Sequence, residues 1–401
     1  MNLGGLWENR MEKMIIYGYS SIGEAVYQEC IRRELPILCF CEDTKVQKSE
    51  IHAKINLFSF NEIVNRKLNG KFIICIPNAR PVIKKLEDAG YSNWVLANEY
   101  LSEEHYFQDT FTMKSSRIAV KEIEECIVCH QYLKIPDKLF LKSIDLEITE
   151  KCSMRCRDCS NLMQYYKEPR NYSERELIDS IDSLLKYIDA IYEIRVLGGE
   201  PFMHPEIHRI IEKLISYQKV YRVVIYTNAT IMPTEEMWNV FENKKVEFEM
   251  TDYGKLSRNF FNIKKELDKR DIVYEIIEMS GWTQCSSIIK HGRGQEEVKN
   301  IYNECCAKNL VTLLGGKIYK CPYMANAMNL KAIPVIEEEF IDLKQLEDMG
   351  IETAKQKLKE FLHEKEFFTS CDYCEGRPYN GEEIEPAVQI SEPRYYSVLG
   401  E

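Results

Sequence analysis

The chain has 401 residues, of which 45% are hydrophobic and 29% are charged, and its formal net charge at pH 7 is -11. This length exceeds one ordinary hydrophobic core, so we expect two or three domains. The acidic balance argues against nucleic acid as a ligand, because nucleic-acid-binding proteins usually carry a basic face. No stretch approaches the roughly 18–20 consecutive apolar residues of a membrane helix, so we expect no membrane span.

The sequence contains fifteen cysteines. The N-terminal stretch MNLGGLWENRMEKM is too polar for a signal peptide, so we expect a cytoplasmic protein. Thiols stay reduced in that compartment, and clustered cysteines there indicate metal binding or catalysis more than disulfides. Cysteines that stand in apolar stretches are expected to be small buried residues; these are Cys30, Cys39, Cys41 and Cys75.

Residues 1–103 are predicted to form a small α/β domain. The apolar stretches MIIYG, LPILCFCED and KFIICIPN alternate with segments of helical periodicity, which is typical of a parallel sheet covered on both faces. The first stretch runs into Gly18-Tyr-Ser-Ser-Ile-Gly23, one glycine short of the dinucleotide-binding fingerprint. Glu42 and Asp43 end the second, where an acid can meet a ribose.

This region resembles the Rossmann-type domains of sugar acyltransferases and other nucleotide-sugar enzymes, and two interpretations stay open. In the first, Gly18 and Gly23 frame a nucleotide or nucleotide-sugar site. In the second, the fold serves only for docking or dimerisation. Ser20 replaces the second glycine of the fingerprint, which would otherwise let the backbone approach a pyrophosphate closely.

Residues 104–140 are predicted to be a connector that is partly helical. They contain Cys126-Ile-Val-Cys-His130, which matches the pattern for c-type haem attachment. Such attachment belongs outside the cytoplasm, and the sequence shows no export signal. We therefore interpret the motif as two cysteines on one turn of a helix.

Residues 141–300 show a second alternation of strands and helices. The predicted strands are SIDLEIT, EIRVLGG, RVVIYTN, VEFEMTD and IVYEIIEM. Between the first two, Ser173 is predicted to cap a helix, and Glu176 completes a capping box. The pattern predicts a parallel β/α barrel or part of one.

Cys152, Cys156 and Cys159 directly follow the first of these strands with the spacing C-x3-C-x2-C. A zinc site usually closes with four protein ligands, as two separated pairs. A triplet this compact fits three corners of a 4Fe–4S cubane instead and leaves one iron open to a substrate or cofactor. In such barrels, active groups gather at the carboxyl ends of the strands.

The cysteine spacing after a first barrel strand resembles that of the radical S-adenosylmethionine (SAM) superfamily. The resemblance implies that the open iron binds the amino and carboxylate groups of SAM. One electron then splits the sulfonium, and the resulting 5′-deoxyadenosyl radical removes a hydrogen atom from a substrate. Many family members have an aromatic residue before the third cysteine, where this chain has Asp158.

The next strand ends in Gly198-Gly199-Glu200-Pro201, which resembles the GGEP segment of the same family. The resemblance implies that its backbone and acid hold the SAM amino group; glycine permits close approach, and a carboxylate pairs with an ammonium. The following strands end in Tyr226-Thr227-Asn228 and Thr251-Asp252. Thr227, Asn228 and Thr251 are therefore expected to contact the ribose or methionine of SAM.

Residues 301–401 contain a second group of cysteines. Cys306, Gly316 and Cys321 have the spacing C-x9-G-x4-C, and CDYC follows at 371–374. The pattern resembles the auxiliary-cluster domains of SPASM and twitch radical SAM enzymes. Between the first two cysteines, VTLLGGKIYKC predicts a β-hairpin that turns at Gly315-Gly316 and brings its ends together.

No cysteine follows Cys374, so the shorter, twitch-type version is expected. The resemblance implies one auxiliary 4Fe–4S cluster for electron transfer, held by Cys306, Cys321, Cys371 and Cys374. Two alternatives stay open: the four thiols hold a structural zinc, or Cys305 takes the place of Cys306.

The family resemblance implies an oxidoreductase or isomerase that acts on a small molecule, with flavodoxin or ferredoxin as the electron donor. An oxidation would pass the second electron of the substrate to the auxiliary cluster. An epimerisation would need a hydrogen-atom donor, for which Cys285 is the candidate; the alternative is an ordinary loop cysteine.

The resemblance of the N-terminal domain to those of nucleotide-sugar enzymes implies a sugar, a nucleotide sugar or a glycan precursor as the substrate, as in carbohydrate biosynthesis. The alternative within enzymes is a peptide-modifying maturase. The alternative from another class is a non-catalytic iron–sulfur sensor or scaffold, which would leave SAM intact.

Overall fold

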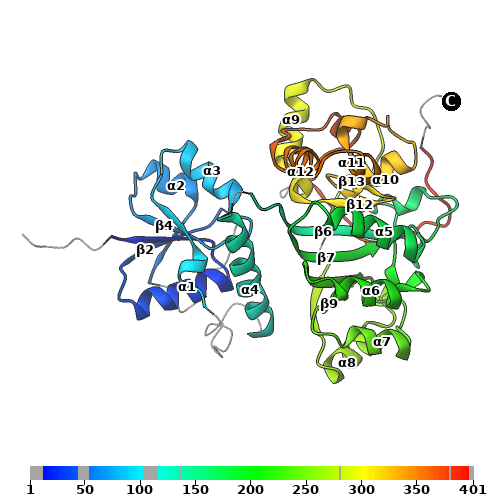
Figure 1. Cartoon of the computed structure of the whole chain (residues 1–401), viewed down its shortest axis with the longest axis horizontal. Helices are drawn as coiled ribbons and strands as arrows, with labels where there is room; N and C mark the ends of the chain where they lie inside the picture. The colour runs from blue at the N-terminus through cyan, green and yellow to red at the C-terminus, as the bar shows by residue number, and fades with distance from the viewer. Residues whose placement is uncertain are drawn as a thin grey trace, which may run out of the picture. The chain divides into compact units, whose positions relative to one another are not determined.

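The structure is a computed structural model that describes residues 12–43, 54–102, 116–135, 137–279, 281–378 and 381–396. The chain divides into two compact units, Met1–Lys138 and Leu139–Glu401 (Figure 1). Each unit contains a sheet with parallel strands, which confirms the α/β class.

The sheet of the first unit has five parallel strands in the order β3-β2-β1-β4-β5. The strands are β1 (Met14–Tyr17), β2 (Ile37–Cys41), β3 (Asn56–Phe58), β4 (Lys71–Ile74) and β5 (Trp94–Leu96). The helices are α1 (Ser21–Arg32), α2 (Phe60–Asn65), α3 (Arg80–Asp88) and α4 (Ser116–Leu133). Helix α4 belongs to the region expected to be a connector, and it contacts α1.

Both faces of this sheet are covered, because successive side chains of a strand point to opposite faces. Ile16 of β1 packs in one hydrophobic cluster with Val26 of α1. Its neighbour Ile15 packs in a second cluster with Ile63 of α2 and Leu86 of α3. The predicted buried cysteines are all buried: Cys30, Cys39, Cys41 and Cys75.

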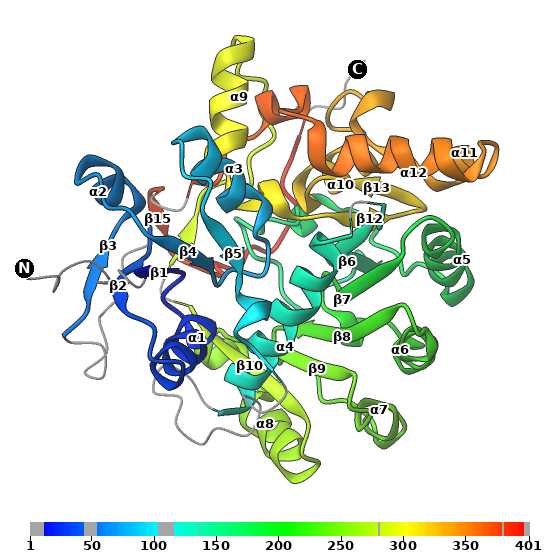
Figure 2. The same ribbon diagram turned by 60° about the vertical axis from the view of Figure 1, so that its left-hand side comes forward.

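The sheet of the second unit has eight strands in the order β10-β9-β8-β7-β6-β12-β13-β14. Strands β6 to β10 are parallel and correspond to the five predicted strands: β6 (Phe140–Thr149), β7 (Ala190–Gly198), β8 (Val220–Thr227), β9 (Val246–Asp252) and β10 (Val273–Glu278). Helices α5 (Glu174–Leu185), α6 (Ile207–Ser216) and α7 (Glu235–Phe241) lie outside this sheet (Figure 2). The capping box at Ser173 and Glu176 is confirmed.

The predicted hairpin is also confirmed, and it extends the barrel sheet. Strands β12 (Thr312–Leu314) and β13 (Lys317–Tyr319) are antiparallel and turn at Gly315 and Gly316, both with positive φ. Strand β12 lies parallel to β6. The remaining elements are α8 (Phe260–Lys269), β11 (Trp282–Thr283), α9 (Gln295–Glu304), α10 (Pro322–Asn329), β14 (Ile341–Asp342), α11 (Leu343–Glu347), α12 (Ile351–Lys359) and β15 (Glu383–Ile384).

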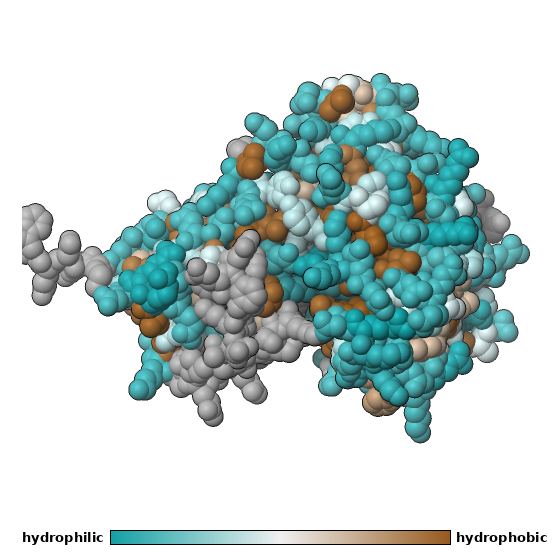
Figure 3. Space-filling view, turned by 60° about the horizontal axis from the view of Figure 1, so that its bottom comes forward, coloured by the Kyte–Doolittle hydropathy of each residue, from teal (hydrophilic) through white to brown (hydrophobic). Residues whose placement is uncertain are grey.

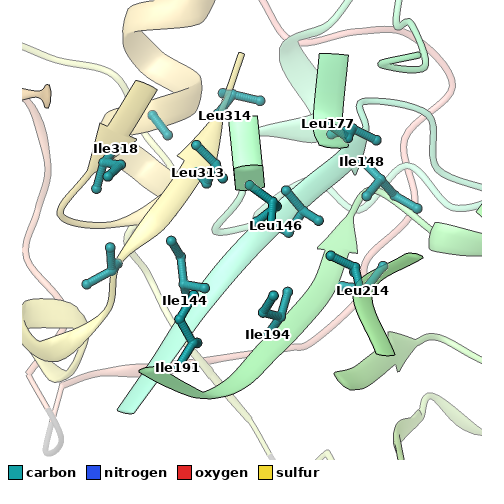
Figure 4. Close-up of a cluster of buried hydrophobic side chains, with 14 of the residues drawn as sticks. Ile144, Leu146, Ile148, Leu177, Ile191, Ile194, Leu214, Leu313, Leu314 and Ile318 are labelled. Carbon is teal, nitrogen blue, oxygen red and sulfur yellow. The ribbon is translucent and has the colours of Figure 1, made fainter. Parts of the chain in front are cut away.

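Barrel and hairpin share one hydrophobic core (Figure 4). Ile144 and Leu146 of β6 gather with Ile194 of β7 and with Leu313 and Ile318 of the hairpin. Each such side chain contributes about 1.5–3 kcal/mol when fully buried. The hairpin is therefore fixed relative to the carboxyl ends of the barrel strands.

The face of the molecule in Figure 3 is mostly hydrophilic, with apolar residues scattered over it. Among the residues that the structure describes, no helix combines the length and apolar character needed to span a bilayer.

Candidate active site

A cavity of about 400 Å³ lies at the carboxyl ends of β6 to β9. It brings together eight of the predicted site residues: Cys152, Cys156, Cys159, Gly198, Gly199, Thr227, Asn228 and Thr251. Glu200 and Pro201 are not among the lining residues. The two motifs that stand 39 residues apart at their nearest members, Cys159 and Gly198, thus form one site.

The three thiols of the first motif line the cavity without converging on one point. In the described ranges, no group of three or more His, Cys, Asp or Glu side chains is placed to hold a single metal ion. An iron–sulfur cubane makes no such demand, because each of its irons takes one thiolate. The donor set of Cys152, Cys156 and Cys159 therefore fits a 4Fe–4S cluster with one iron free of protein ligands.

Side-chain amides approach two of these sulfurs. The Nδ2 of Asn228 lies 3.7 Å from Sγ of Cys152, and the Nε2 of Gln389 lies 3.2 Å from Sγ of Cys156. Burial raises the pKa of the Cys156 thiol to about 12. A cysteine ligand of a metal must be a thiolate, so a cluster that bound here would release protons on binding.

Gly198 and Gly199 hold the second motif against the cysteine loop. The backbone N–H of Gly199 donates to the carbonyl of Thr149, and that of Glu200 donates to the carbonyl of Lys151, at 2.9 and 2.8 Å. A Cβ at Gly198 would lie 2.1 Å from the Thr149 oxygen, and one at Gly199 would lie 2.1 Å from the Lys151 oxygen. Only glycine permits this approach, so the motif has a packing role in addition to any contact with SAM.

Glu200 is fully buried behind this loop. Its carboxylate accepts hydrogen bonds from the Thr227 hydroxyl at 2.8 Å, from the Asn228 backbone N–H at 2.8 Å and from the Phe202 backbone N–H at 3.2 Å. Burial raises the pKa of the carboxyl to about 7, and the three donors partly oppose this shift. Three of the roughly four acceptor positions of a carboxylate are thus used within the protein.

Charged residues of β6 and β7 line part of the cavity. Alternate residues of β6 face away from the hydrophobic core and toward this side of the sheet. Asp145 is buried and forms an ion pair with Arg195 of β7. The Arg195 guanidinium also lies 5.4 Å from the ring centroid of Tyr226. The charge of Arg195 is therefore already balanced within the protein.

Sequence reasoning missed two aromatic residues of the cavity, Tyr253 and Trp282. Their rings meet edge to face, with centroids 5.9 Å apart. Burial raises the pKa of the Tyr253 hydroxyl, and the three cysteines of the first motif add to this shift. The sequence did offer one signal for Tyr253: it lies one residue after the polar end of β9.

A second, apolar cavity of about 60 Å³ lies beside the hairpin. Five cysteines line it: Cys285, Cys305, Cys321, Cys371 and Cys374. Cys306 is not among the lining residues. The backbone of Cys305 is extended, so adjacent side chains point in opposite directions, and the Cys306 backbone N–H donates to the Arg377 carbonyl at 2.8 Å.

Backbone N–H groups donate to three of the sulfurs in this cavity. Ala307 donates to Cys305 at 3.4 Å, Met324 to Cys321 at 3.4 Å, and Gly376 to Cys374 at 3.3 Å. Such donors surround the ligand sulfurs of iron–sulfur clusters and tune them.

Cys285 lines the second cavity and not the first. Its thiol is buried, which raises its pKa to about 11, and the charge of Arg377 partly opposes this shift. The thiol is therefore protonated at neutral pH.

In the first unit, the predicted nucleotide-site residues have partners within the protein. Glu42 accepts a hydrogen bond from the backbone N–H of Tyr19 at 3.0 Å. Asp43 accepts from the Tyr17 hydroxyl at 2.7 Å and from Lys85. A Cβ at Gly23 would lie 2.1 Å from the carbonyl oxygen of Gly18, so this pair of glycines permits close packing of the turn.

The haem-like motif lies on α4, as predicted for two cysteines on one turn of a helix. Cys126, Cys129 and His130 are all buried. The Nε2 of His130 lies 2.9 Å from the Ile76 carbonyl oxygen, which can only accept, so Nε2 carries the proton.

Comparison with known proteins places the first site in a family. The model of the Radical SAM superfamily matches residues 146–250. The GTP 3′,8-cyclase of Helicobacter pylori (strain ATCC 700392 / 26695) is 27% identical over 94 residues, which are 22% of this chain and 28% of that protein. The GTP 3′,8-cyclase of Sulfurovum sp. (strain NBC37-1) is 19% identical over 206 residues, which are 47% of this chain and 56% of that protein. The chain thus spans between about a quarter and just over half of the length of these relatives.

Two solved structures also overlap with the chain. BtrN in complex with AdoMet and 2-DOIA has a TM-score of 0.38 and 19% identity and covers 60% of this chain and 94% of its own. The anSMEcpe structure with bound AdoMet has a TM-score of 0.36 and 12% identity, and the match covers 55% of this chain and 82% of that chain. The sequence match covers the segment that contains both the cysteine triplet and GGEP. Residues 146–250 of the chain therefore form a Radical SAM domain.

Proposed function

We propose that this protein reductively cleaves SAM and uses the resulting radical to remove a hydrogen atom from a C–H bond of a sugar, nucleotide sugar or glycan precursor. The observation that carries the proposal is the single cavity in which Cys152, Cys156 and Cys159 meet Gly198, Gly199 and the end of β8. A cluster bound to the three thiols supplies the electron for this cleavage.

The residues around the cavity position SAM and exclude water. The backbone of Gly198 and Gly199 faces the cavity, whereas the Glu200 carboxylate is bonded to β8. We therefore assign the contact with the SAM amino group to the glycine backbone, with Glu200 holding Thr227 and Asn228 in place. Tyr253 and Trp282 form an aromatic wall that shields the reacting C–H bond.

Arg377 supports the inference that the substrate carries an anionic group. This residue lines both cavities, and its guanidinium has no ion-pair partner among the described residues. A guanidinium matches a phosphate or a carboxylate through two parallel hydrogen bonds. Arg377 thus favours a nucleotide sugar or a sugar acid over a neutral sugar.

For the second cavity, we propose an auxiliary 4Fe–4S cluster held by Cys305, Cys321, Cys371 and Cys374. This assignment replaces Cys306 by its neighbour, because Cys305 lines the cavity and receives a backbone N–H. Four thiolates leave no iron open, which supports an electron-transfer role. The place of Cys285 outside the first cavity favours oxidation over an epimerisation that uses this thiol.

The test is an anaerobic assay with reconstituted iron and sulfide, dithionite and SAM. We expect 5′-deoxyadenosine from the wild type and none from Cys152→Ala, Cys156→Ala or Cys159→Ala, whereas Cys126→Ala is the control in the first unit and keeps the activity. The assay is then repeated with deuterated UDP-glucose, glucuronate or glucose, and the transfer of deuterium from each compound into 5′-deoxyadenosine is measured. Reconstituted protein that holds iron and leaves SAM intact would favour the sensor or scaffold alternative.

The assay also tests the anionic class of substrate. Transfer from UDP-glucose or glucuronate but not from glucose is expected, and Arg377→Gln is expected to reduce it at least tenfold. Transfer from a peptide substrate instead would favour the maturase alternative.

A further inference from the structure

The C-terminal segment at residues 387–391 pairs with the loop that carries the cysteine triplet. The backbone N–H of Arg157 donates to the carbonyl of Val388 at 2.7 Å, and that of Ile390 donates to the carbonyl of Arg155 at 2.9 Å. Cys156 and Gln389 face each other across this antiparallel bridge. The segment, red in Figure 1, is more than 230 residues away along the chain.

Three contacts fix the orientation of the Gln389 amide. Its Oε1 accepts from the backbone N–H of Arg155 at 2.9 Å, and an N–H can only donate. The amide nitrogen must therefore lie on the other side. There it donates to the Ala387 carbonyl at 2.7 Å and to Sγ of Cys156 at 3.2 Å.

The chain on the C-terminal side of Gln389 is also anchored. The Arg155 side chain donates to the Ser391 carbonyl at 2.7 Å. The backbone N–H of Arg394 donates to the Gln164 carbonyl at 2.8 Å, and its guanidinium lies 3.6 Å from Asp158. A one-residue shift of the segment would break these contacts together, so the position of Gln389 is well defined.

A second amide has the same relationship to another sulfur. The Oδ1 of Asn228 accepts from the backbone N–H of Thr230 at 3.0 Å, so its Nδ2 faces Sγ of Cys152 at 3.7 Å. Two amides from elements remote from the cysteine loop thus donate to two of its three thiols. An N–H aimed at a ligand sulfur stabilises the more electron-rich state of a cluster and raises its reduction potential.

We propose that the Gln389 amide, through its N–H donated to Cys156, raises the reduction potential of the cluster at Cys152, Cys156 and Cys159. The inference rests on the cluster of the proposed function but not on its substrate. It gives the C-terminal segment a role in the chemistry, because the segment brings an N–H donor to a sulfur of the cysteine loop from outside the barrel.

The experiment uses full-length variants reconstituted with iron and sulfide in the absence of oxygen. Gln389→Glu has the same shape and keeps the acceptor for Arg155, but it loses the N–H and adds a negative charge. Gln389→Met has a similar length but carries neither the acceptor for Arg155 nor the N–H donor. Gln389→Lys restores a donor. Gln356→Glu is the control, because Gln356 is an exposed residue of α12 whose side chain donates to the exposed Glu360.

Midpoint potentials are measured by redox titration followed by electron paramagnetic resonance, with iron content as a second readout. We expect the midpoint of the first cluster to become more negative in Gln389→Met and still more negative in Gln389→Glu. Gln389→Lys is expected to return it to the wild-type value or above. The auxiliary cluster and the Gln356→Glu control are expected to be unchanged.

Unchanged midpoints in Gln389→Met and Gln389→Glu at wild-type iron content would overturn the proposal. Loss of iron in all three Gln389 variants would also overturn it, because the amide would then hold the loop rather than tune the cluster. A wild-type protein that leaves SAM intact, with the midpoint shifts present, would refute the proposed function and leave the role of Gln389 standing.

Discussion

The carboxylate of Glu200 accepts a hydrogen bond from the backbone N–H of Asn228 at 2.8 Å, so the loop after β7 holds the end of β8. The Thr227 hydroxyl donates to the same carboxylate. Both donors belong to residues that line the cavity. The acid of the GGEP motif therefore shapes the first cavity through the neighbouring strand.

Glu200→Gln is expected to weaken this connection. One carboxylate oxygen becomes an NH₂ group that faces an N–H or O–H donor, and a buried donor left unsatisfied costs about 1–3 kcal/mol. We expect a lower melting temperature and weaker SAM binding, measured by calorimetry on the reconstituted protein. The control is Glu212→Gln, which changes an exposed residue of α6. Equal melting temperatures for the two variants would contradict the role assigned to Glu200.

Gly199→Ala is expected to separate the two motifs of the first site. Its Cβ would lie 2.1 Å from the Lys151 oxygen and 2.9 Å from the Cys152 nitrogen, so the backbone of the cysteine loop must move. We expect loss of the first cluster, which is about half of the iron of a protein with two 4Fe–4S clusters. The iron content of anaerobically reconstituted protein measures this loss.

The matched control for this substitution is Gly350→Ala. A Cβ at Gly350 would meet no heavy atom within 4 Å, and the residue precedes α12 with a φ of -64°. Full iron content in both variants would show that the cysteine loop tolerates the displacement.

Cys305→Ser and Cys306→Ser distinguish the two candidates for the auxiliary ligand. Cys305 shares a cavity with Cys321, Cys371 and Cys374, and Cys306 does not. We therefore expect Cys305→Ser to lose the auxiliary cluster and Cys306→Ser to keep it, as read from iron content and the electron paramagnetic resonance spectrum. The reverse result would support the assignment from the spacing C-x9-G-x4-C.

The parts of the structure that local sequence determines were predicted well. The five barrel strands, the capping box at Ser173 and the hairpin turn at Gly315 each depend on residues within a few positions of one another. The meeting of the cysteine triplet with GGEP also followed, because parallel strands place their carboxyl ends on one edge of a sheet.

Contacts between distant segments were not predictable in this way. The contact of Gln389 with Cys156 joins residues 233 positions apart, and no local pattern marks it. The choice between Cys305 and Cys306 depends on the backbone direction after α9, which spacing alone does not give. The bond from Tyr19 to Glu42 depends on a side-chain rotamer at the end of a strand.

The pH dependence of stability in the first unit tests the interpretation of the haem-like motif. His130 is buried, which lowers its pKa to about 4, and its bond to Ile76 partly opposes this shift. An exposed histidine in the unfolded chain has a pKa of about 6.5, so the unfolded state binds more protons between pH 6.5 and 4. The stabilising effect of the neutral imidazole is thus complete above pH 6.5 and is lost as the pH falls, by about 3 kcal/mol at pH 4.

His130→Gln keeps an N–H for the Ile76 carbonyl and removes the titration. We expect this variant to lose less stability than the wild type between pH 6.5 and 4, measured by the urea dependence of hydrogen exchange in peptides from α4. His291→Gln, which changes an exposed residue of the second unit, should follow the wild type. If His130→Gln also follows the wild type, His130 titrates alike in the folded and unfolded states. A histidine that is accessible to protons in the folded state would then be accessible to other ligands too, and the haem-like motif would have to be considered again as a binding site.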